Sequence, residues 1–185
     1  MKVLILNGSP RLNGNTAAAL KAIQKGILEK SPAADIEFCN VTQWNIKGCI
    51  ACNTCKNNGG NCVQPDDTNQ IIQKIADADL LLLGSPVYYW GLTAQLKTVI
   101  DKFYCRNSAL RAAGKKTVGL VTVGGAALDD PEYNLISGQI DCICEYLHWC
   151  HLFTENISAY DLGEVAGNQT LLDSLQLLGT TFPSF

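Results

Sequence analysis

The loop at residues 8–16 has the composition of a phosphate-binding site. It reads Gly-Ser-Pro-Arg-Leu-Asn-Gly-Asn-Thr and joins a short apolar run to an alanine-rich segment typical of a helix. The first N–H groups of a helix attract a phosphate because they have no intrahelical acceptor and lie at the positive end of the helix dipole. Hydroxyl, amide and guanidinium side chains add further donors. The residues that we predict to hold the phosphate are Ser9, Arg11, Asn15 and Thr16.

Other phosphate-binding motifs do not match this loop. The Gly-x-Gly-x-x-Gly of dinucleotide-binding folds is absent, and the Gly-Asn-Thr of residues 14–16 lacks the lysine of a P-loop. The loop has no cysteine to serve as a phosphatase nucleophile and no acidic residue to hold Mg²⁺. An alternative is that Asn15 and Thr16 only cap a helix. Capping alone does not require Arg11 and two glycines, so the loop favours a bound phosphate monoester.

A second unusual loop follows the apolar run at residues 80–83. It carries three consecutive aromatic residues between Gly84 and Gly91. Because consecutive residues point in different directions, some of these rings face outward, where a planar cofactor or a partner subunit can pack on them. Glycines in the loop after the next apolar run would let the same cofactor approach a third wall. The predicted ring contacts are Pro86, Val87, Tyr88, Tyr89, Trp90, Val123, Gly124 and Gly125.

Four of the nine cysteines are clustered, at Cys49, Cys52, Cys55 and Cys62. Thiolates at this spacing can converge on one [4Fe-4S] cluster, with two adjacent glycines allowing the chain to return. A zinc site, redox-active or structural thiols, and disulfides formed during purification in air are the alternatives that the pattern leaves open. We expect the remaining cysteines to be small core residues, and they are Cys39, Cys105, Cys142, Cys144 and Cys150.

Alternating strands and helices must position these loops. An open parallel sheet with helices on both faces is the arrangement that such alternation predicts, in one domain over residues 1–185 with a Cys-rich excursion at 42–66. Ligands of these sheets bind beyond the carboxyl ends of the strands, where the loops described above lie. The predicted strands are 2–7, 35–41, 80–83, 116–123 and a strand within 148–159, and the predicted helices are 15–30, 67–78, 92–104, 131–147 and 168–182.

Composition narrows the class of protein. Hydrophobic residues make up 47% of the chain and charged residues 17%, which is typical of a globular protein. A net charge of -3 at pH 7 gives no electrostatic reason to bind nucleic acid or an anionic membrane. No apolar stretch approaches the roughly 20 residues that span a bilayer, and the odd number of cysteines argues against a disulfide framework. We therefore expect a cytoplasmic protein with no nucleic-acid partner and no membrane span.

The first loop, together with Gly-Ser-Pro-Val-Tyr and the Leu-Thr-Ala-Gln-Leu-Lys and Ile-Asp-Lys segments of residues 84–102, resembles the NAD(P)H-dependent FMN reductase family. The similarity is greatest to the branch that includes iron–sulfur flavoproteins. It implies a flavodoxin-like three-layer sandwich with strand order 2-1-3-4-5, and a homodimer or homotetramer. It also implies that FMN places its phosphate on the first loop and its isoalloxazine ring on the other two.

The resemblance implies an FMN-dependent oxidoreductase with NAD(P)H as cosubstrate. The electron acceptor would be a small molecule such as a quinone, a nitro or azo compound, or a flavin. The alternative is an iron–sulfur flavoprotein that accepts single electrons from ferredoxin through a [4Fe-4S] cluster. No catalytic side chain beyond the flavin is expected, and we interpret His148 and His151 as structural or surface residues.

Overall fold

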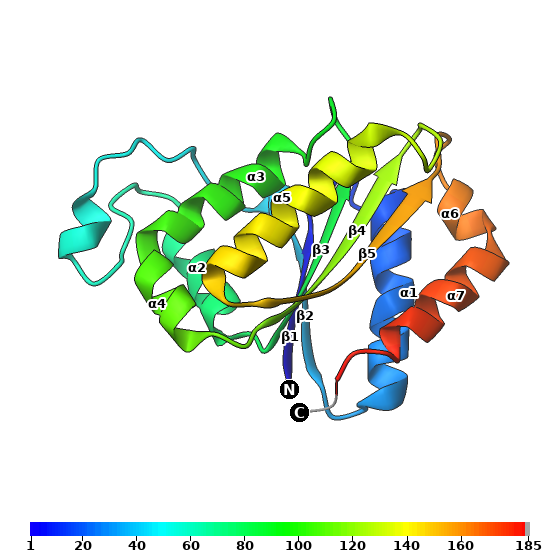
Figure 1. Ribbon diagram of the computed structural model, residues 1–185, viewed down its shortest axis with the longest axis horizontal. Coiled ribbons are helices and arrows are strands. Elements are labelled where there is room, and N and C mark those ends of the chain that lie inside the picture. Colours follow the sequence, from blue (N-terminus) through cyan, green and yellow to red (C-terminus); the bar gives the residue numbers. More distant parts are fainter. Residues whose placement is uncertain (184–185) are drawn as a thin grey trace.

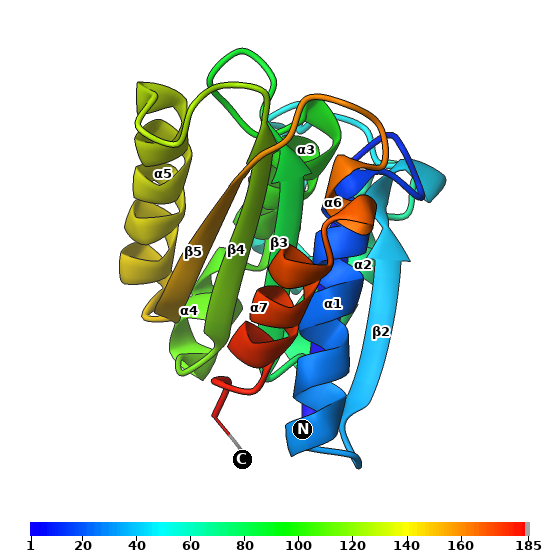
Figure 2. The same ribbon diagram turned by 90° about the vertical axis from the view of Figure 1, so that its right-hand side faces the viewer.

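The protein is built on a five-stranded parallel sheet covered by helices on both faces (Figures 1 and 2). The computed structural model describes residues 1–183. All neighbouring strands are parallel and follow the order β2-β1-β3-β4-β5, which confirms the predicted fold class and strand order. The strands are β1 (Lys2–Asn7), β2 (Asp35–Asn40), β3 (Leu80–Pro86), β4 (Thr117–Gly124) and β5 (Cys150–Ser158).

The helices divide between the two faces of the sheet, as Figure 2 shows. Helices α1 (Asn15–Lys30), α6 (Glu164–Gly167) and α7 (Gln169–Gly179) pack on one face. The other face is covered by α2 (Thr68–Asp77), α3 (Ala94–Asp101), α4 (Asn107–Ala113) and α5 (Pro131–Leu147).

Each face of the sheet has its own hydrophobic cluster. Leu4 and Leu6 of β1 belong to the cluster beneath α2, α3 and α5, whereas Val3 and Ile5 belong to the one beneath α1 and α7. This alternation follows from the two-residue period of a strand. β4 is buried along its whole length, as expected for a central strand with helices on both sides.

The helix predicted over residues 92–104 is shorter in the structure. The Thr93 hydroxyl accepts a hydrogen bond from the Leu96 N–H and caps the helix, so α3 begins at Ala94. The chain continues as a 3-10 helix over Lys102–Arg106 and then as α4, which the sequence did not predict. The Lys102 side chain turns into the Cys-rich excursion, where it is buried and bonded to the Gln64 side chain.

The prediction that all five scattered cysteines lie in the core is wrong for two of them. Cys39, Cys105 and Cys144 are buried, but Cys142 and Cys150 are exposed. Cys142 lies on the solvent side of α5, two residues from the buried Cys144. Cys150 begins the edge strand β5, which is only partly covered.

The two histidines have the structural roles that we expected. His148 ends α5 in a left-handed conformation and accepts a hydrogen bond from Arg111 Nε at 3.0 Å. His151 Nδ1 lies 2.5 Å from the Asp141 carboxylate, and its Nε2 lies 3.1 Å from Thr154 Oγ1. Within residues 1–183, no helix combines the length and apolar character needed to cross a bilayer.

Candidate functional site

Hydrogen bonds join the loops that follow β1, β3 and β4. The Gly8 N–H donates to the Gly84 carbonyl at 2.7 Å, and the Thr93 hydroxyl donates to the Gly8 carbonyl at 2.8 Å. The Val87 N–H donates to the Val123 carbonyl at 2.8 Å. The three loops predicted from the sequence therefore lie together at the carboxyl ends of the strands (Figure 2). We call these loops, at residues 8–16, 84–91 and 123–125, the cradle.

The first loop of the cradle leaves the N-terminus of α1 uncapped by side chains. Gly14 is the N-cap residue, and no side chain of the described residues bonds to this end of the helix. The alternative in which Asn15 and Thr16 serve only as caps is therefore wrong. Ser9 is buried, and its hydroxyl accepts a hydrogen bond from the Arg11 N–H at 3.1 Å, which tightens the loop. The first-turn N–H groups of α1 remain free for an anion.

Asn15 has a role that the sequence did not indicate. Its Nδ2 donates to the Asp161 carbonyl at 2.8 Å, and its Oδ1 accepts from the Val165 N–H at 3.2 Å. The side chain thus fastens the loop between β5 and α6 to the first loop. Thr16 is buried beside it and Arg11 is exposed. Direct contact of these residues with a phosphate stays a prediction.

The aromatic residues of the second loop lie on a tight turn. Tyr88 and Gly91 exchange backbone hydrogen bonds of 3.0 and 3.1 Å, so Tyr89 and Trp90 occupy the two central positions. Both have left-handed backbone angles, with φ of 47° and 58°. Such a conformation is costly for residues other than glycine and is typical of functional loops. Tyr89 and Trp90 are 97% and 56% exposed. Their contact with a cofactor ring stays a prediction.

The glycines of the third wall lie close to side chains of the protein itself. A Cβ built on Gly124 would lie 2.4 Å from the Glu132 Oε1 atom, and one built on Gly125 would lie 2.9 Å from the Tyr160 ring. Glycine at both positions therefore avoids crowding against these two side chains. Contact of their backbone with a cofactor ring stays a prediction.

Glu132 is the acidic side chain nearest to this wall. Its Oε1 atom is buried, and no residue of the described chain hydrogen-bonds to it. Burial, with a smaller contribution from the charge of Asp130, raises the pKa of the Glu132 carboxyl above its ordinary value. The ionised form of this carboxyl is therefore less stable here than it is in water.

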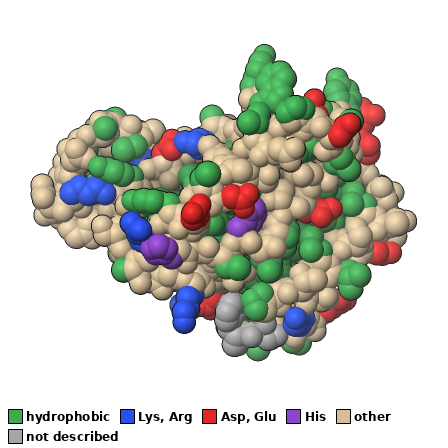
Figure 3. Space-filling model, viewed as in Figure 1, with side chains coloured by type: hydrophobic (Ala, Val, Ile, Leu, Met, Phe, Trp, Pro, Cys, Tyr) green, Lys and Arg blue, Asp and Glu red, His purple; other side chains and the backbone are tan. Residues whose placement is uncertain are grey.

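Sequence reasoning missed Tyr160 and Leu162, which follow β5 at the same edge of the sheet. They are 84% and 69% exposed. Figure 3 shows hydrophobic side chains projecting from this edge, which is the upper one in that view. A signal was present in the sequence: two large apolar residues and a glycine come directly after a strand, where a ligand is expected.

The four clustered cysteines border one small cavity. Cys105 and Lys102 border it too, and its volume is about 20 Å³, which is about the space of one water molecule. The Lys102 Nζ lies 3.6 Å from the Cys62 sulfur and 3.6 Å from the Asp66 carboxylate. Within residues 1–183, no group of three or more His, Cys, Asp or Glu side chains converges to hold a metal ion. The thiols share a cavity, but they do not form a cluster site in this conformation. A bound metal stays a prediction.

Comparison with known protein families supports the assignment of these loops to a cofactor site. The model of the NADPH-dependent FMN reductase family matches residues 1–136, which include all three loops of the cradle. The chain belongs to this family.

The chain is similar in sequence to an iron-sulfur flavoprotein and similar in structure to two azoreductases. An iron-sulfur flavoprotein of Methanocaldococcus jannaschii is 36% identical over 132 residues, which cover 68% of this chain and 65% of that protein. An azoreductase of Bacillus anthracis has a similar structure, with a TM-score of 0.74, 14% identity and coverage of 98% and 100% of the two chains. A structure of an FMN-dependent NADH-azoreductase from the same species, in complex with FMN, has a TM-score of 0.68, 13% identity and coverage of 97% and 98%. At these identities the two solved structures show the fold alone.

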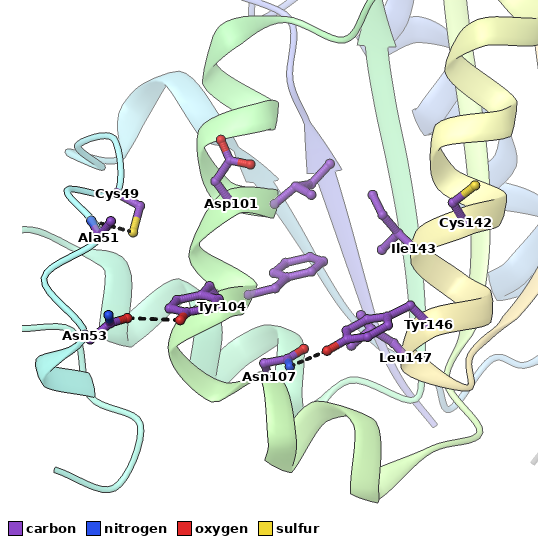
Figure 4. Close-up of a pocket in the computed structure, with 12 residues that line it drawn as sticks. Cys49, Ala51, Asn53, Asp101, Tyr104, Asn107, Cys142, Ile143, Tyr146 and Leu147 are labelled. Carbon is purple, nitrogen blue, oxygen red and sulfur yellow. Dashed lines mark hydrogen bonds between the residues drawn. The ribbon is translucent and has the colours of Figure 1, made fainter. Parts of the chain in front are cut away.

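This family member also has a large groove that the sequence did not predict. The groove has a volume of about 680 Å³ and lies between the 3-10 helix at Lys102–Arg106, α5 and the Cys-rich excursion. Tyr104 and Tyr146 lie on opposite sides of it (Figure 4). Their hydroxyl groups are hydrogen-bonded to Asn53 and Asn107 at 3.0 and 2.8 Å, which holds both rings in place.

Proposed function

We propose that this protein is an FMN-dependent oxidoreductase that transfers electrons from NAD(P)H to a small-molecule acceptor. The observation that carries the proposal is the cradle, in which three loops are hydrogen-bonded into one structure at the carboxyl ends of β1, β3 and β4. The family match over residues 1–136 supports the same conclusion. The acceptors named above, a quinone, a nitro or azo compound, or a flavin, are part of the proposal.

The residues of the cradle fit FMN. A phosphate monoester suits the free N–H groups at the start of α1 and the exposed guanidinium of Arg11. A planar ring suits the exposed aromatic side chains of the second loop. We assign the phosphate to Ser9, Arg11, Asn15 and Thr16, and the ring to Pro86–Trp90 and Val123–Gly125.

The chain would bind and orient its cofactor rather than supply reactive groups. When bound, FMN provides the redox chemistry between NAD(P)H and the acceptor. The tight turn at Tyr88–Gly91 holds two rings at the mouth of the cradle. Backbone N–H groups of the loop after β4 would stabilise negative charge on the reduced cofactor. We expect no protonating side chain to be essential.

Titration of apo-protein with FMN tests the proposal directly. We expect flavin fluorescence to be quenched on binding, and the reconstituted protein to oxidise NAD(P)H when a quinone or an azo dye is added. Arg11→Gln should weaken FMN binding by about 1–3 kcal/mol through loss of charged hydrogen bonds. Lys25→Gln is the matched control, because Lys25 is an exposed cation further along α1. A wild-type protein that takes up no added FMN would refute the proposal.

An iron–sulfur flavoprotein that accepts electrons from ferredoxin is the second candidate. The shared cavity of Cys49, Cys52, Cys55 and Cys62 is the observation in its favour. A cubane cluster would need the excursion to open, because the cavity is only about 20 Å³ in volume. Anaerobic purification followed by assays of iron and acid-labile sulfide separates the two candidates. Iron retained at the wild-type level in Cys55→Ser would exclude Cys55 as a ligand.

The proposal includes an assembly and a location. Exposed hydrophobic side chains at the mouth of the cradle would be covered in a homodimer or homotetramer. Free cysteines throughout the described chain suit the reducing conditions of the cytoplasm. Size-exclusion chromatography with light scattering tests the assembly.

A further inference from the structure

The loop between β5 and α6 holds an aromatic ring beside the cradle. Tyr160 follows β5, and its side chain is 84% exposed. One edge of its ring nevertheless packs on Gly125, where a built Cβ would lie 2.9 Å from the Tyr160 Cδ2 atom. The Tyr160 ring and the loop after β4 therefore form one continuous surface beside the cradle.

Hydrogen bonds order the backbone on both sides of this ring. The Ala159 N–H donates to the Gly124 carbonyl at 2.7 Å. The N–H groups of Tyr160 and Asp161 both donate to one carboxylate oxygen of Glu164, at 2.8 and 3.0 Å. A ring held by a bonded backbone is preorganised for contact, because little conformational freedom is lost when a ligand binds.

The same loop is fastened to the phosphate side of the cradle. Both polar atoms of the Asn15 side chain bond to its backbone, at Asp161 and Val165. Figure 2 shows the orange segment between β5 and α6 passing next to the blue loop after β1. The loop thus contacts the elements expected at both ends of the cofactor, the phosphate and the ring.

We propose that Tyr160 is a further cofactor contact and that residues 159–163 form a fourth wall of the FMN site. The inference rests on the proposed function. An exposed tyrosine has the chemistry for this position, since a flavin ring packs well on an aromatic face. Asn15 is then a positioning residue, because its bonds to the loop set where the Tyr160 ring lies.

FMN titrations of three variants test the assignment, with flavin fluorescence and particle size recorded together. Tyr160→Ala should raise the Kd for FMN by about two- to twelvefold, the equivalent of one aromatic pair. The flavin bound to this variant should also be brighter, because one quenching ring is gone. Tyr160→Phe keeps the aromatic face and should therefore retain wild-type affinity. Leu177→Ala, which changes a 68% exposed residue of α7 outside the proposed wall, should behave like the wild type.

The possible failures are distinguishable. An unchanged Kd and unchanged fluorescence in Tyr160→Ala would overturn the inference and leave the proposed function standing. Dissociation of an oligomer by Tyr160→Ala, with unaltered FMN affinity per protomer, would also overturn it by assigning the ring to a subunit contact. A wild-type protein that binds no FMN would reject the proposed function and this inference together.

Discussion

Substitution of Tyr89 should stabilise the protein while it weakens cofactor binding. Tyr89 occupies the first central position of the turn at Tyr88–Gly91 with a φ of 47°, and its side chain is 97% exposed. Asparagine tolerates this left-handed conformation and is one of the residues that such turns prefer. Tyr89→Asn therefore removes backbone strain at a position where almost no buried area can be lost.

The magnitude follows from two opposing contributions. A left-handed conformation costs about 1–2 kcal/mol for an ordinary L-residue, and most of this cost should be relieved by asparagine. The lost contact is with the Trp90 ring, whose centroid lies 6.4 Å away at an angle of 58°. A solvated pair of this kind contributes about 0.5 kcal/mol. The net gain of about 1 kcal/mol corresponds to a rise in Tm of about 2–4 °C for a domain of this size.

Thermal unfolding of the apo-protein and FMN titration are the two assays. We expect Tyr89→Asn to raise the apo Tm and to weaken FMN binding by about 0.5–1.5 kcal/mol, because one ring contact is removed. Tyr89→Phe is the control, since it keeps both the strain and the ring and should change neither value. A lower apo Tm in Tyr89→Asn would refute the assignment of strain. Unaltered FMN affinity would remove Tyr89 from the site.

Three further predictions concern other parts of the chain. Glu132→Gln should raise the Tm at pH 7, because the raised pKa of Glu132 means that its ionised form destabilises the fold. The gain in Tm should vanish below about pH 4, where the wild-type carboxyl is protonated as well. An equal gain at both pH values would contradict the reasoning. Gly26→Ala should lower the free energy of unfolding by about 1–3 kcal/mol, because its Cβ would lie 1.8 Å from a backbone oxygen of α7. Gly138→Ala, whose Cβ would meet open space on α5, should raise it by up to about 1 kcal/mol. Chemical denaturation measures both changes. Iodoacetamide should alkylate the exposed Cys142 of the folded protein but not the buried Cys144, because burial raises the pKa of the Cys144 thiol to about 12. Peptide mass spectrometry identifies the alkylated residue, and alkylation of Cys144 in preference to Cys142 would contradict the prediction.

Local sequence patterns were sufficient for the strands and for most of the helices. The run at residues 80–83 predicts β3 because a central strand is buried on both faces and needs apolar residues throughout. The start of α5 was equally readable, since Asp130 caps the helix and Pro131 begins it. The strand order, by contrast, came from the family resemblance, because the apolar runs of the five strands carry no information about their neighbours.

The features that the sequence missed depend on contacts between distant segments. The packing of Tyr160 on Gly125 joins residues 35 positions apart, and neither residue signals the other. Helices α4 and α6 are too short for a helical period to be recognised. The burial of Lys102 next to the Cys62 sulfur could not be foreseen either, since a lysine at the end of an amphipathic helix is normally solvated.

These long-range contacts also decide which substitutions can identify the phosphate site. Weaker FMN binding in an Asn15 variant would not establish a phosphate contact, because removal of its amide also frees the loop that carries Tyr160. Arg11 offers a cleaner test. Its backbone hydrogen bonds stay within its own loop, to Ser9 and Gly14, and its guanidinium is exposed. Loss of affinity in Arg11→Gln with normal flavin quenching would therefore place the phosphate on the first loop, whereas loss of both would indicate that the whole cradle had moved.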